Sequence, residues 1–452
     1  MKRKWLFISL IIAALSAFAV YAQFSSNRDI TAEFENNDNG RALLQVFSAL
    51  KSNYLKDVDD TVVIEGAIKG MIEALDDRYT SYTTAKDAAR DRQDLSGSFE
   101  GIGVLLSPRD RAEQKIIEVV NVYRDGPAWN AGMKRGDIFA EVDGVNVEDF
   151  TSDEIVDVVR GPKGTNVHLG MRRSGVDGLV YFDIVRDTIE IIDVEEALLP
   201  NNVGYIRISS FRTQKIHEQL LVHLKSLEAQ GATSLILDLR DNVGGLLNQG
   251  ILVADEFLDG GDIVFQRIRG VTQRIASADP HAVKLPMVVL VNEHSASASE
   301  IVAAALQDNA RAKVIGVETF GKGVGQSVLP LNNGGQFTFT SFEWLTPNRQ
   351  SIHSQGITPD VIAEDTRFGN VISLEGQGAA SGEEIEFVVN GEVIGKAVAD
   401  EEGNFKFVQL IARRDVSEVP GEALISLEDD SALKVAYETL LLEMAQSTAQ
   451  GQ

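Results

Sequence analysis

The sequence reads MVVLVNEHSASASEIVAAALQ over residues 287–307: an apolar run, a stretch of small and polar residues, and a second apolar run. Five consecutive apolar residues, Met287–Val291, are typical of a strand that is buried on both faces of a parallel sheet. Ile301–Gln307 predicts a helix. We therefore expect a strand, a tight turn and a helix, with serines at the helix N-terminus, where backbone N–H groups lack intrahelical acceptors.

The surrounding sequence repeats this alternation of strand and helix from about residue 190 to residue 365. Such alternation predicts an α/β core with parallel strands. The expected strands are Val203–Ser209, Ser234–Leu239 and Lys313–Val317, and the expected helices are Lys215–Ala229 and Leu246–Leu258.

The flanking regions have other patterns. Residues 41–95 carry apolar positions at helical spacing, whereas residues 97–186 consist of short strands and glycine turns. Residues 370–425 again predict strands, at Glu384–Val389, Glu392–Val398 and Asn404–Leu410, and a helix near Ser431–Met444 closes the chain. The chain is therefore expected to be a multidomain protein of mixed α/β and α+β type.

Composition excludes several functional classes. The 452 residues are 44% hydrophobic and 24% charged, with a formal net charge of −25, which argues against binding to nucleic acids or anionic membranes. No cysteine is present, so disulfides, thiolate metal sites and a cysteine nucleophile are excluded. The six histidines include no HExxH pair, so we expect neither a zinc site nor any other cofactor.

The N-terminus predicts export. Met1-Lys2-Arg3-Lys4 precedes a run from Trp5 to Ala22 that contains no charge and ends in small residues. This is the pattern of a secretory signal, and an uncleaved membrane anchor is the alternative. We expect a periplasmic or cell-envelope location, with membrane contact only through this segment.

Ser297 and Lys322 are the candidate catalytic pair. Lys322 lies in Thr319–Gln326, between two glycines that allow close approach to another backbone. If burial keeps its amine neutral, the amine can accept the proton of a serine hydroxyl and so make a nucleophile. On chemistry alone Ser295 and Ser299 are equal candidates, and Ser297-Ala298-Ser299-Glu300 also fits a capping box that merely begins a helix.

Two further alternatives concern His294 and the fold itself. His294 lies three residues before Ser297, so a Ser-His hydrolase is conceivable on spacing. A scaffold that binds peptides without cleaving them is the alternative to an enzyme of any kind, because a fold does not imply a function.

Taken together, the motifs resemble those of the carboxyl-terminal processing (tail-specific) serine proteases, which contain an inserted PDZ domain. Seven segments, which run in that family's order and span roughly residues 40–365, carry the resemblance: Leu75–Tyr82, Gly101–Val104, Ala131–Gly144, Leu237–Gly245, Asn292–Asp308, Thr319–Gln326 and Gln355–Asp360.

The resemblance assigns roles at the active site. It implies that Ser297 is the nucleophile, that Lys322 is its base, and that Gln326 orients the lysine. It also implies oxyanion donors at the Ala298 N–H and at one glycine of the pair Gly244-Gly245, of which we favour Gly244. Two departures are Val243, where the family commonly has proline, and Val324-Gly325, where it often has a bulkier residue before the glutamine.

The resemblance also implies the substrate and the architecture. Gly101-Ile102-Gly103-Val104 is similar to a PDZ carboxylate loop, whose N–H groups hold a terminal carboxylate while the peptide adds as an edge strand. The implied partners are protein C-termini, and an adaptor or self-association is also compatible. The implied core is a crotonase-like α/β fold. The expected parts are a signal or anchor (1–22), a helical region (23–96), a PDZ domain (97–186), a protease core (187–368), and a β insertion with a closing helix (369–452).

Overall fold

A computed structural model of the chain describes residues 30–111, 114–123, 125–173, 175–365, 371–389, 392–400, 402–410, 427–428 and 430–450. The chain divides into two compact units, Met1–Tyr82 and Thr83–Gln452. The predicted signal or anchor at residues 1–22 lies outside the described residues. No helix in the described part of the chain is both long enough and apolar enough to cross a membrane.

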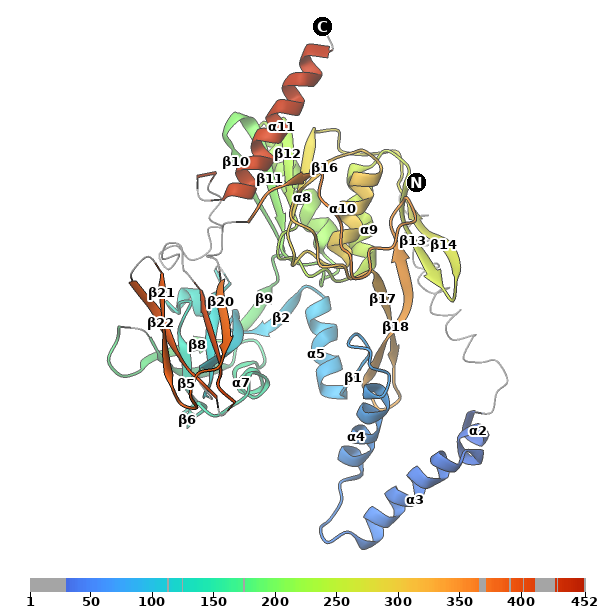
Figure 1. The fold of residues 1–452 in the computed structure, drawn as a ribbon, viewed down its shortest axis with the longest axis vertical. Helices are drawn as coiled ribbons and strands as arrows, with labels where there is room; N and C mark the ends of the chain where they lie inside the picture. The colour runs from blue at the N-terminus through green and yellow to red at the C-terminus, as the bar shows by residue number, and fades with distance from the viewer. Residues whose placement is uncertain are drawn as a thin grey trace. The chain divides into compact units, whose positions relative to one another are not determined.

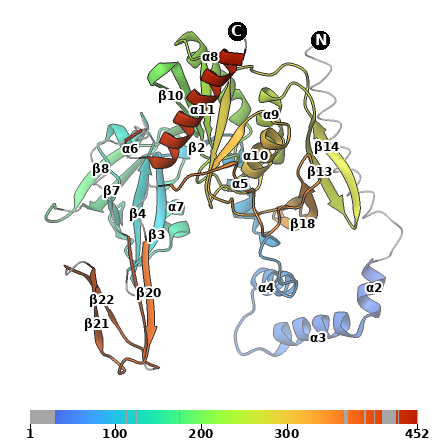
Figure 2. The ribbon, with the colours of Figure 1, turned by 45° about the horizontal axis from the view of Figure 1, so that its top comes forward.

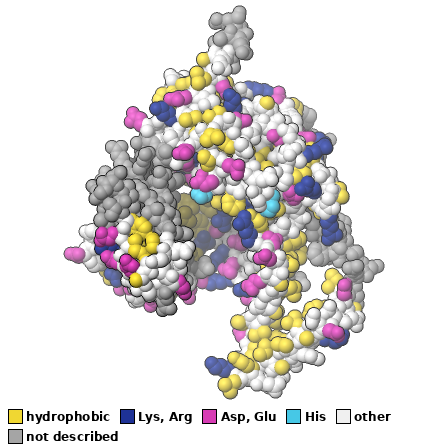
Figure 3. All heavy atoms as spheres, viewed as in Figure 1, with side chains coloured by type: hydrophobic (Ala, Val, Ile, Leu, Met, Phe, Trp, Pro, Cys, Tyr) yellow, Lys and Arg dark blue, Asp and Glu magenta, His cyan; other side chains and the backbone are white. Residues whose placement is uncertain are grey.

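The first unit contains the helices α2 (Ile30–Asn36), α3 (Asp38–Asn53) and α4 (Asp60–Glu73), and the helical spacing over residues 41–95 had predicted the last two. The side chains of Asn37 and Asp59 cap α3 and α4 by accepting from backbone N–H groups of the first turn. Apolar side chains gather on the exposed surface of these two helices (Figure 3), for example Val46 and Val62, which are 57% and 67% exposed. The short strand β1 (Ser81–Thr83) follows them.

The second unit begins with α5 (Ala85–Leu95) and then contains an antiparallel sheet with its own apolar core. The sheet order is β3-β4-β5-β7-β8, with β6 paired to β5, so β3 lies at an edge (Figure 2). Two strands pair where the chain enters and leaves this region, β2 (Ser98–Gly101) and β9 (Asp187–Glu190). The other elements are β3 (Val104–Arg111), β4 (Gln114–Val122), α6 (Pro127–Asn130), β5 (Ile138–Val142), β6 (Val145–Asn146), α7 (Ser152–Val159), β7 (Asn166–Arg172) and β8 (Val180–Val185).

The second unit also contains a six-stranded sheet, in the order β10-β11-β12-β15-β16-β19. All neighbours pair in parallel except β10 with β11, so the predicted parallel core is confirmed and carries one antiparallel edge strand. The strands are β10 (Val194–Leu199), β11 (Val203–Ile208), β12 (Ser234–Asp238), β15 (Met287–Val291), β16 (Lys313–Gly316) and β19 (Val361–Ile362), and the 3-10 turn η1 (Pro200–Asn202) joins the first two.

Helices cover both faces of this sheet (Figure 1). Alternate residues of a strand point to opposite faces, and both faces of β15 are apolar. Val289 therefore packs in the cluster that includes α8 (Ile216–Ala229), α9 (Leu247–Phe257) and α10 (Ala298–Asp308), whereas its neighbour Val288 packs against the long helix α11 (Ser431–Gln450).

Two further β elements complete the second unit. A second sheet, for which the sequence had given no expectation, contains the antiparallel neighbours β17-β18-β13-β14. The described residues of 371–410 contain two antiparallel strand pairs, β20 with β23 and β21 with β22, and the three strands predicted there have the predicted bounds. The closing helix α11 was predicted too short, because it continues beyond Met444 to Gln450. The strands are β13 (Asp262–Ile268), β14 (Val271–Ser277), β17 (Val324–Pro330), β18 (Gln336–Leu345), β20 (Val371–Gln377), β21 (Glu384–Val389), β22 (Glu392–Val398) and β23 (Asn404–Leu410).

Candidate active site

A strained turn between β15 and α10 carries Ser297. The backbone of Ser297 has φ 57° and ψ −114°, a conformation that side chains with a Cβ rarely adopt and that costs about 1–3 kcal/mol. Its neighbours Ala296 and Ala298 are 5% and 1% exposed, whereas Ser297 itself is only partly buried. The turn therefore presents one serine at the start of α10, where backbone N–H groups point out of the helix.

The other two serines of the motif are buried, and their hydroxyls bond to backbone carbonyl oxygens. Ser295 and Ser299 are both 0% exposed. The Ser295 hydroxyl donates to the carbonyl oxygen of Leu239 at 2.8 Å, and the Ser299 hydroxyl donates to that of Asn242 at 2.8 Å. Both hydroxyls therefore hold the serine loop (residues 292–297, between β15 and α10) and the start of α10 against the segment that follows β12.

Glu300 connects the serine loop to the lysine loop, which is the segment of residues 317–323 between β16 and β17. Its carboxylate is 0% exposed and accepts at Oε2 from the N–H of Ser297 (2.7 Å) and from the N–H of Lys322 (2.9 Å). Oε1 accepts from the Thr319 hydroxyl (2.6 Å) and from the Gly321 N–H (2.7 Å). Burial raises the pKa of Glu300, and these hydrogen bonds oppose the shift.

The sequence had indicated Glu300 only as the acidic member of a capping box. The N–H of Ser297 does donate to its carboxylate, as a capping box requires. The three other donors belong to Thr319, Gly321 and Lys322, which lie 19 to 22 positions further along the chain. Through them Glu300 binds the lysine loop as well as Ser297.

The glycines beside Lys322 allow the close approach that the sequence predicted. A Cβ on Gly323 would lie 2.6 Å from the backbone nitrogen of His353, and one on Gly321 would lie 2.8 Å from that of Gln355. The carbonyl oxygen of Lys322 accepts from the indole N–H of Trp344 at 2.8 Å. The lysine loop is therefore held by the backbone of residues 353–355 on one side and by the Trp344 indole on another.

The roles of the Lys322 amine and of Gln326 stay predictions. The contacts described above join Ser297 to Lys322 through their backbones. The side-chain nitrogen of Gln326 lies 3.5 Å from the carbonyl oxygen of Val324, so in this conformation the Gln326 amide donates to a residue of its own strand, β17. A bulge between Gly325 and Gln326 changes the register of β17 against β18 at this place.

The predicted oxyanion donors lie next to each other. A Cβ on Gly244 would lie 2.5 Å from the carbonyl oxygen of Ala296, 2.8 Å from Cβ of Ser297 and 2.9 Å from the nitrogen of Ala298. Because φ of Gly244 is also 89°, only glycine fits there without strain. The turn after β12 thus packs directly on the serine loop.

The Gly244 N–H already has an acceptor in this conformation. It donates to the side-chain oxygen of Asn242 at 2.9 Å, and Asn242 in turn donates to the carbonyl oxygen of Ile208 at 2.8 Å. Val243, in the place of the family's proline, is 63% exposed, so Asn242 rather than residue 243 holds the turn. The neighbouring Gly245 has φ 152° and packs against the backbone of Phe211.

The predicted carboxylate loop, Gly101–Val104, lies between β2 and β3. Ile102 is 2% exposed and Gly103 has φ 80°, as a tight turn requires. The carbonyl oxygens of Ile102 and Gly103 accept from Ala128 and Tyr123, both at 2.9 Å. Val104 begins the edge strand β3, and capture of a terminal carboxylate by the loop stays a prediction.

Other chemically active side chains lie away from these contacts. The side chain of His294 is 63% exposed, and its Nε2 lies 3.8 Å from the carboxylate of Glu293. Among the described residues, the group with a spacing that could hold a metal ion is Asp255, Asp279 and His281, which is mostly exposed and involves none of the predicted site residues.

Comparisons with known proteins identify the family of the chain. The sequence matches peptidase family S41 over residues 202–363, a PDZ domain over residues 118–173 and the N-terminal domain of the activating protease CtpB over residues 10–87. The carboxy-terminal processing protease CtpA of Bacillus subtilis is 36% identical over 370 residues, which cover 80% of this chain and 78% of that protein. A carboxy-terminal-processing protease of Bartonella bacilliformis is 38% identical over 326 residues, covering 71% of this chain and 74% of that protein.

Among solved structures, a photosystem II D1 C-terminal processing protease is 28% identical, with a TM-score of 0.45, and the match covers 73% of this chain and 88% of that one. The extent and identity of the sequence matches decide the assignment. The chain belongs to peptidase family S41, as a carboxy-terminal processing serine protease that contains a PDZ domain.

Proposed function

We propose that Ser297 and Lys322 form the catalytic dyad. The neutral amine of Lys322 accepts the hydroxyl proton as Ser297 Oγ attacks the scissile carbonyl carbon, and then returns that proton to the leaving amine as the peptide bond breaks. Water attacks the acyl-enzyme in the same way and regenerates Ser297. The single observation that carries this proposal is the shared carboxylate of Glu300, which binds the backbones of both residues.

The oxyanion would be held by the N–H groups of Ala298 and Gly244. Preorganised donors of this kind stabilise the negative charge that develops on the carbonyl oxygen. The proximity of Gly244 to Ala298 supports the assignment. Because Asn242 accepts from Gly244 in this conformation, substrate binding must turn this N–H away from Asn242 or share it. Gln326 would orient Lys322 after its side chain leaves Val324.

Substrate selection would use the PDZ domain. Its strand β3 is an edge strand, so an unstructured C-terminal segment can add to the sheet while the loop Gly101–Val104 holds the terminal carboxylate. Cleavage then occurs upstream of the captured end. We infer a crotonase-like topology for the protease core, with the domain bounds expected above, and export to the periplasm or cell envelope through residues 1–22.

Cleavage of an unstructured protein with an apolar C-terminal tail tests the dyad. Ser297→Ala and Lys322→Ala in the full chain should each abolish cleavage while binding of the tail peptide persists. Lys284→Ala is the matched control, because Lys284 is exposed and pairs with Asp259 at the surface. If both active-site variants still cut, the dyad is wrong. If the wild type cuts no tailed substrate, a non-catalytic peptide-binding scaffold becomes the better reading.

Two controls separate the dyad from other hydrolytic chemistry. His294→Ala should retain near-wild-type rates, and loss of activity in that variant would favour a Ser-His hydrolase. Chelators should leave the rate unchanged.

A further inference from the structure

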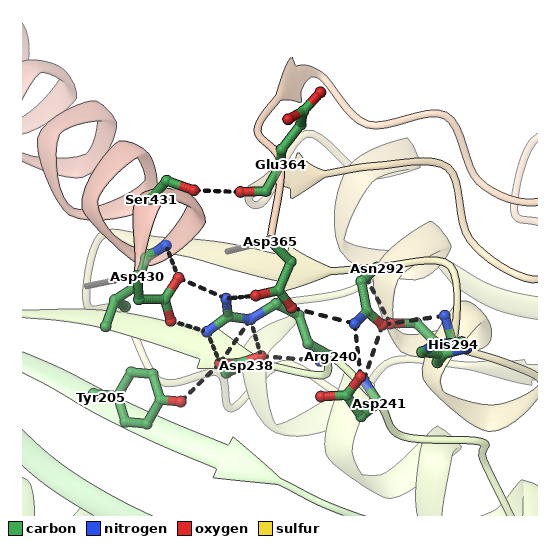
Figure 4. Close-up of polar contacts among 12 residues, drawn as sticks. Tyr205, Asp238, Arg240, Asp241, Asn292, His294, Glu364, Asp365, Asp430 and Ser431 are labelled. Carbon is green, nitrogen blue, oxygen red and sulfur yellow. Dashed lines mark hydrogen bonds and ion pairs between the residues drawn. The ribbon is translucent and has the colours of Figure 1, made fainter. Parts of the chain in front are cut away.

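A buried ion cluster surrounds Arg240, the residue directly before the turn that carries Gly244 (Figure 4). The Arg240 side chain is 1% exposed. Its guanidinium donates to Asp430 through two bonds of 2.9 and 2.8 Å, and to Asp238 at the end of β12 at 2.6 Å. A longer contact of 3.4 Å reaches Asp365.

Attraction between the guanidinium and the carboxylates holds this cluster together. Burial opposes the charge on Arg240, but Asp238 and Asp430 outweigh it and raise the pKa of Arg240 above its usual range. The hydroxyl of Tyr205 donates to Asp238 at 2.7 Å and supports the buried carboxylate. Removing the guanidinium would leave Asp238 and Asp430 buried without a cation, and replacing Asp430 would break its bonds to Arg240, so either change frees groups that the cluster now holds in place.

Two of the carboxylates flank the β insertion that contains β20–β23. Asp365 follows β19 just before the insertion, and Asp430 follows it at the start of α11. Asp430 also accepts from the N–H of Leu433 at 2.9 Å, so the same carboxylate caps α11 and binds Arg240. One guanidinium therefore binds both places where the protease core meets the insertion.

A second route runs from the same cluster to the turn. Asn292 donates to Asp365 at 3.4 Å and to the side chain of Asp241 at 2.8 Å, and it accepts from the Asp241 N–H at 2.9 Å. Asp241 has φ 62° and is the first residue of the turn Asp241–Gly245. Asn292 is also the first residue after β15, so it touches both the turn and the serine loop.

We propose that Arg240 is a positioning residue for the hydrolytic reaction, which couples the two ends of the β insertion, through Asp365 and Asp430, to the conformation of the turn that holds Gly244. The inference rests on the proposed function, because the turn affects the rate only if its N–H groups stabilise the oxyanion formed at Ser297. A change in the position of the insertion or of α11 would thereby change the conformation of the turn and the rate of hydrolysis.

The test compares Asp430→Asn with Tyr437→Phe in the full chain. Asparagine keeps the helix cap but replaces one acceptor with a donor, so it breaks the two-bond fork to Arg240. Tyr437 accepts from Asn201 at 2.6 Å and fastens α11 at another place, so Tyr437→Phe loosens α11 without touching Arg240. We expect kcat of Asp430→Asn to fall by at least about tenfold with KM within about twofold, and kcat of Tyr437→Phe to stay within about twofold of the wild type.

A second readout separates positioning from stability. A peptide boronic acid adds to a serine and places an oxygen in the oxyanion site, so its affinity should fall in Asp430→Asn by about the same factor as kcat, while an uncleaved tail peptide binds equally. The inference is overturned if Asp430→Asn keeps the wild-type kcat, or if Tyr437→Phe lowers kcat as much. Should Asp430→Asn not fold, Asp365→Asn decides: a kcat at least about threefold lower supports the inference, and an unchanged kcat refutes it.

Ser297→Ala in the same assay distinguishes the two levels of failure. If Ser297→Ala remains active, the proposed dyad fails. If Ser297→Ala is inactive while Asp430→Asn is fully active, only the role of Arg240 fails.

Discussion

The backbone N–H groups of Ser297 and Lys322 donate to the same oxygen atom, Oε2 of Glu300, at 2.7 and 2.9 Å. The two residues are 25 positions apart, and the buried carboxylate fixes the backbone of one relative to the other. A direct bond from the Phe320 N–H to the Ser295 carbonyl oxygen, at 3.0 Å, joins the same two loops.

Replacement of Glu300 by glutamine should therefore reduce activity. Glutamine offers only one acceptor oxygen, so at least one donor among Ser297, Thr319, Gly321 and Lys322 loses its partner, and an unsatisfied buried group costs about 1–3 kcal/mol. We expect a lower melting temperature and a kcat reduced by at least about tenfold for a tailed substrate. The exposed helical residue Glu228 provides the control, and Glu228→Gln should change neither quantity. A fully active Glu300→Gln would contradict the role of the shared carboxylate.

The stability that Glu300 contributes should depend on pH. Burial raises its folded-state pKa above the ordinary value of 4.5, so the unfolded chain releases the proton more readily than the folded chain. The contribution of Glu300 to the free energy of unfolding is thus fully present below pH 4.5, and it is lost as pH rises through the pKa that Glu300 has in the folded chain. The difference in free energy of unfolding between wild type and Glu300→Gln, measured by denaturant titration from pH 4 to pH 7, should shrink as pH rises. A difference that grows over this range would show that the hydrogen bonds to the carboxylate outweigh its burial.

Substitution of Gly244 by alanine should remove activity. The added Cβ would meet the Ala296 carbonyl oxygen at 2.5 Å and the Ser297 Cβ at 2.8 Å, so the turn must move away from the serine loop. Loss of one oxyanion donor by itself costs about 10²–10³ in kcat. Gly231→Ala is the matched control, because Gly231 has nearly the same φ, 88° against 89°, but open space around the added Cβ. Steady-state kinetics should show near-wild-type rates for Gly231→Ala, and equal losses in the two variants would leave only backbone strain as the cause.

Ser295→Ala and Ser299→Ala should lower the thermal stability of the protein and leave its reactive serine intact. Each variant removes the hydroxyl that now donates to a buried carbonyl oxygen, of Leu239 or of Asn242. A backbone N–H still donates to each of these oxygens, so the loss should be about 0.5–1.5 kcal/mol. Thermal unfolding checks the stability, and labelling with a fluorophosphonate checks whether a reactive serine remains. Retained labelling in both variants, and its loss in Ser297→Ala, is the expected pattern. Loss of labelling in a folded Ser295→Ala or Ser299→Ala would instead identify that serine as the nucleophile.

Local sequence patterns were sufficient for most elements of the fold. The apolar run Met287–Val291 is a strand with the predicted bounds, and the strands of residues 384–410 also lie where they were predicted. Side-chain periodicity reports which surfaces are buried, and it is readable within a few residues. The sheet of β13, β14, β17 and β18 was missed, because β14, β17 and β18 are largely half-exposed and contain no buried apolar run. The alternation of phenylalanine and threonine over residues 337–340 in β18 is the signal that could have predicted a strand there.

The sequence by itself determined that a serine stands at a helix start, that glycines permit backbones to meet beside Lys322, and that the core is a parallel sheet. Only the tertiary structure decided that Glu300 binds the loops of both Ser297 and Lys322, that Asn242 accepts from the Gly244 N–H, and that Arg240 meets Asp430, a residue 190 positions away. The physical reason is that propensity and periodicity act between near neighbours, whereas a buried carboxylate or guanidinium takes its partners from whichever segments the packed core brings within about 3 Å.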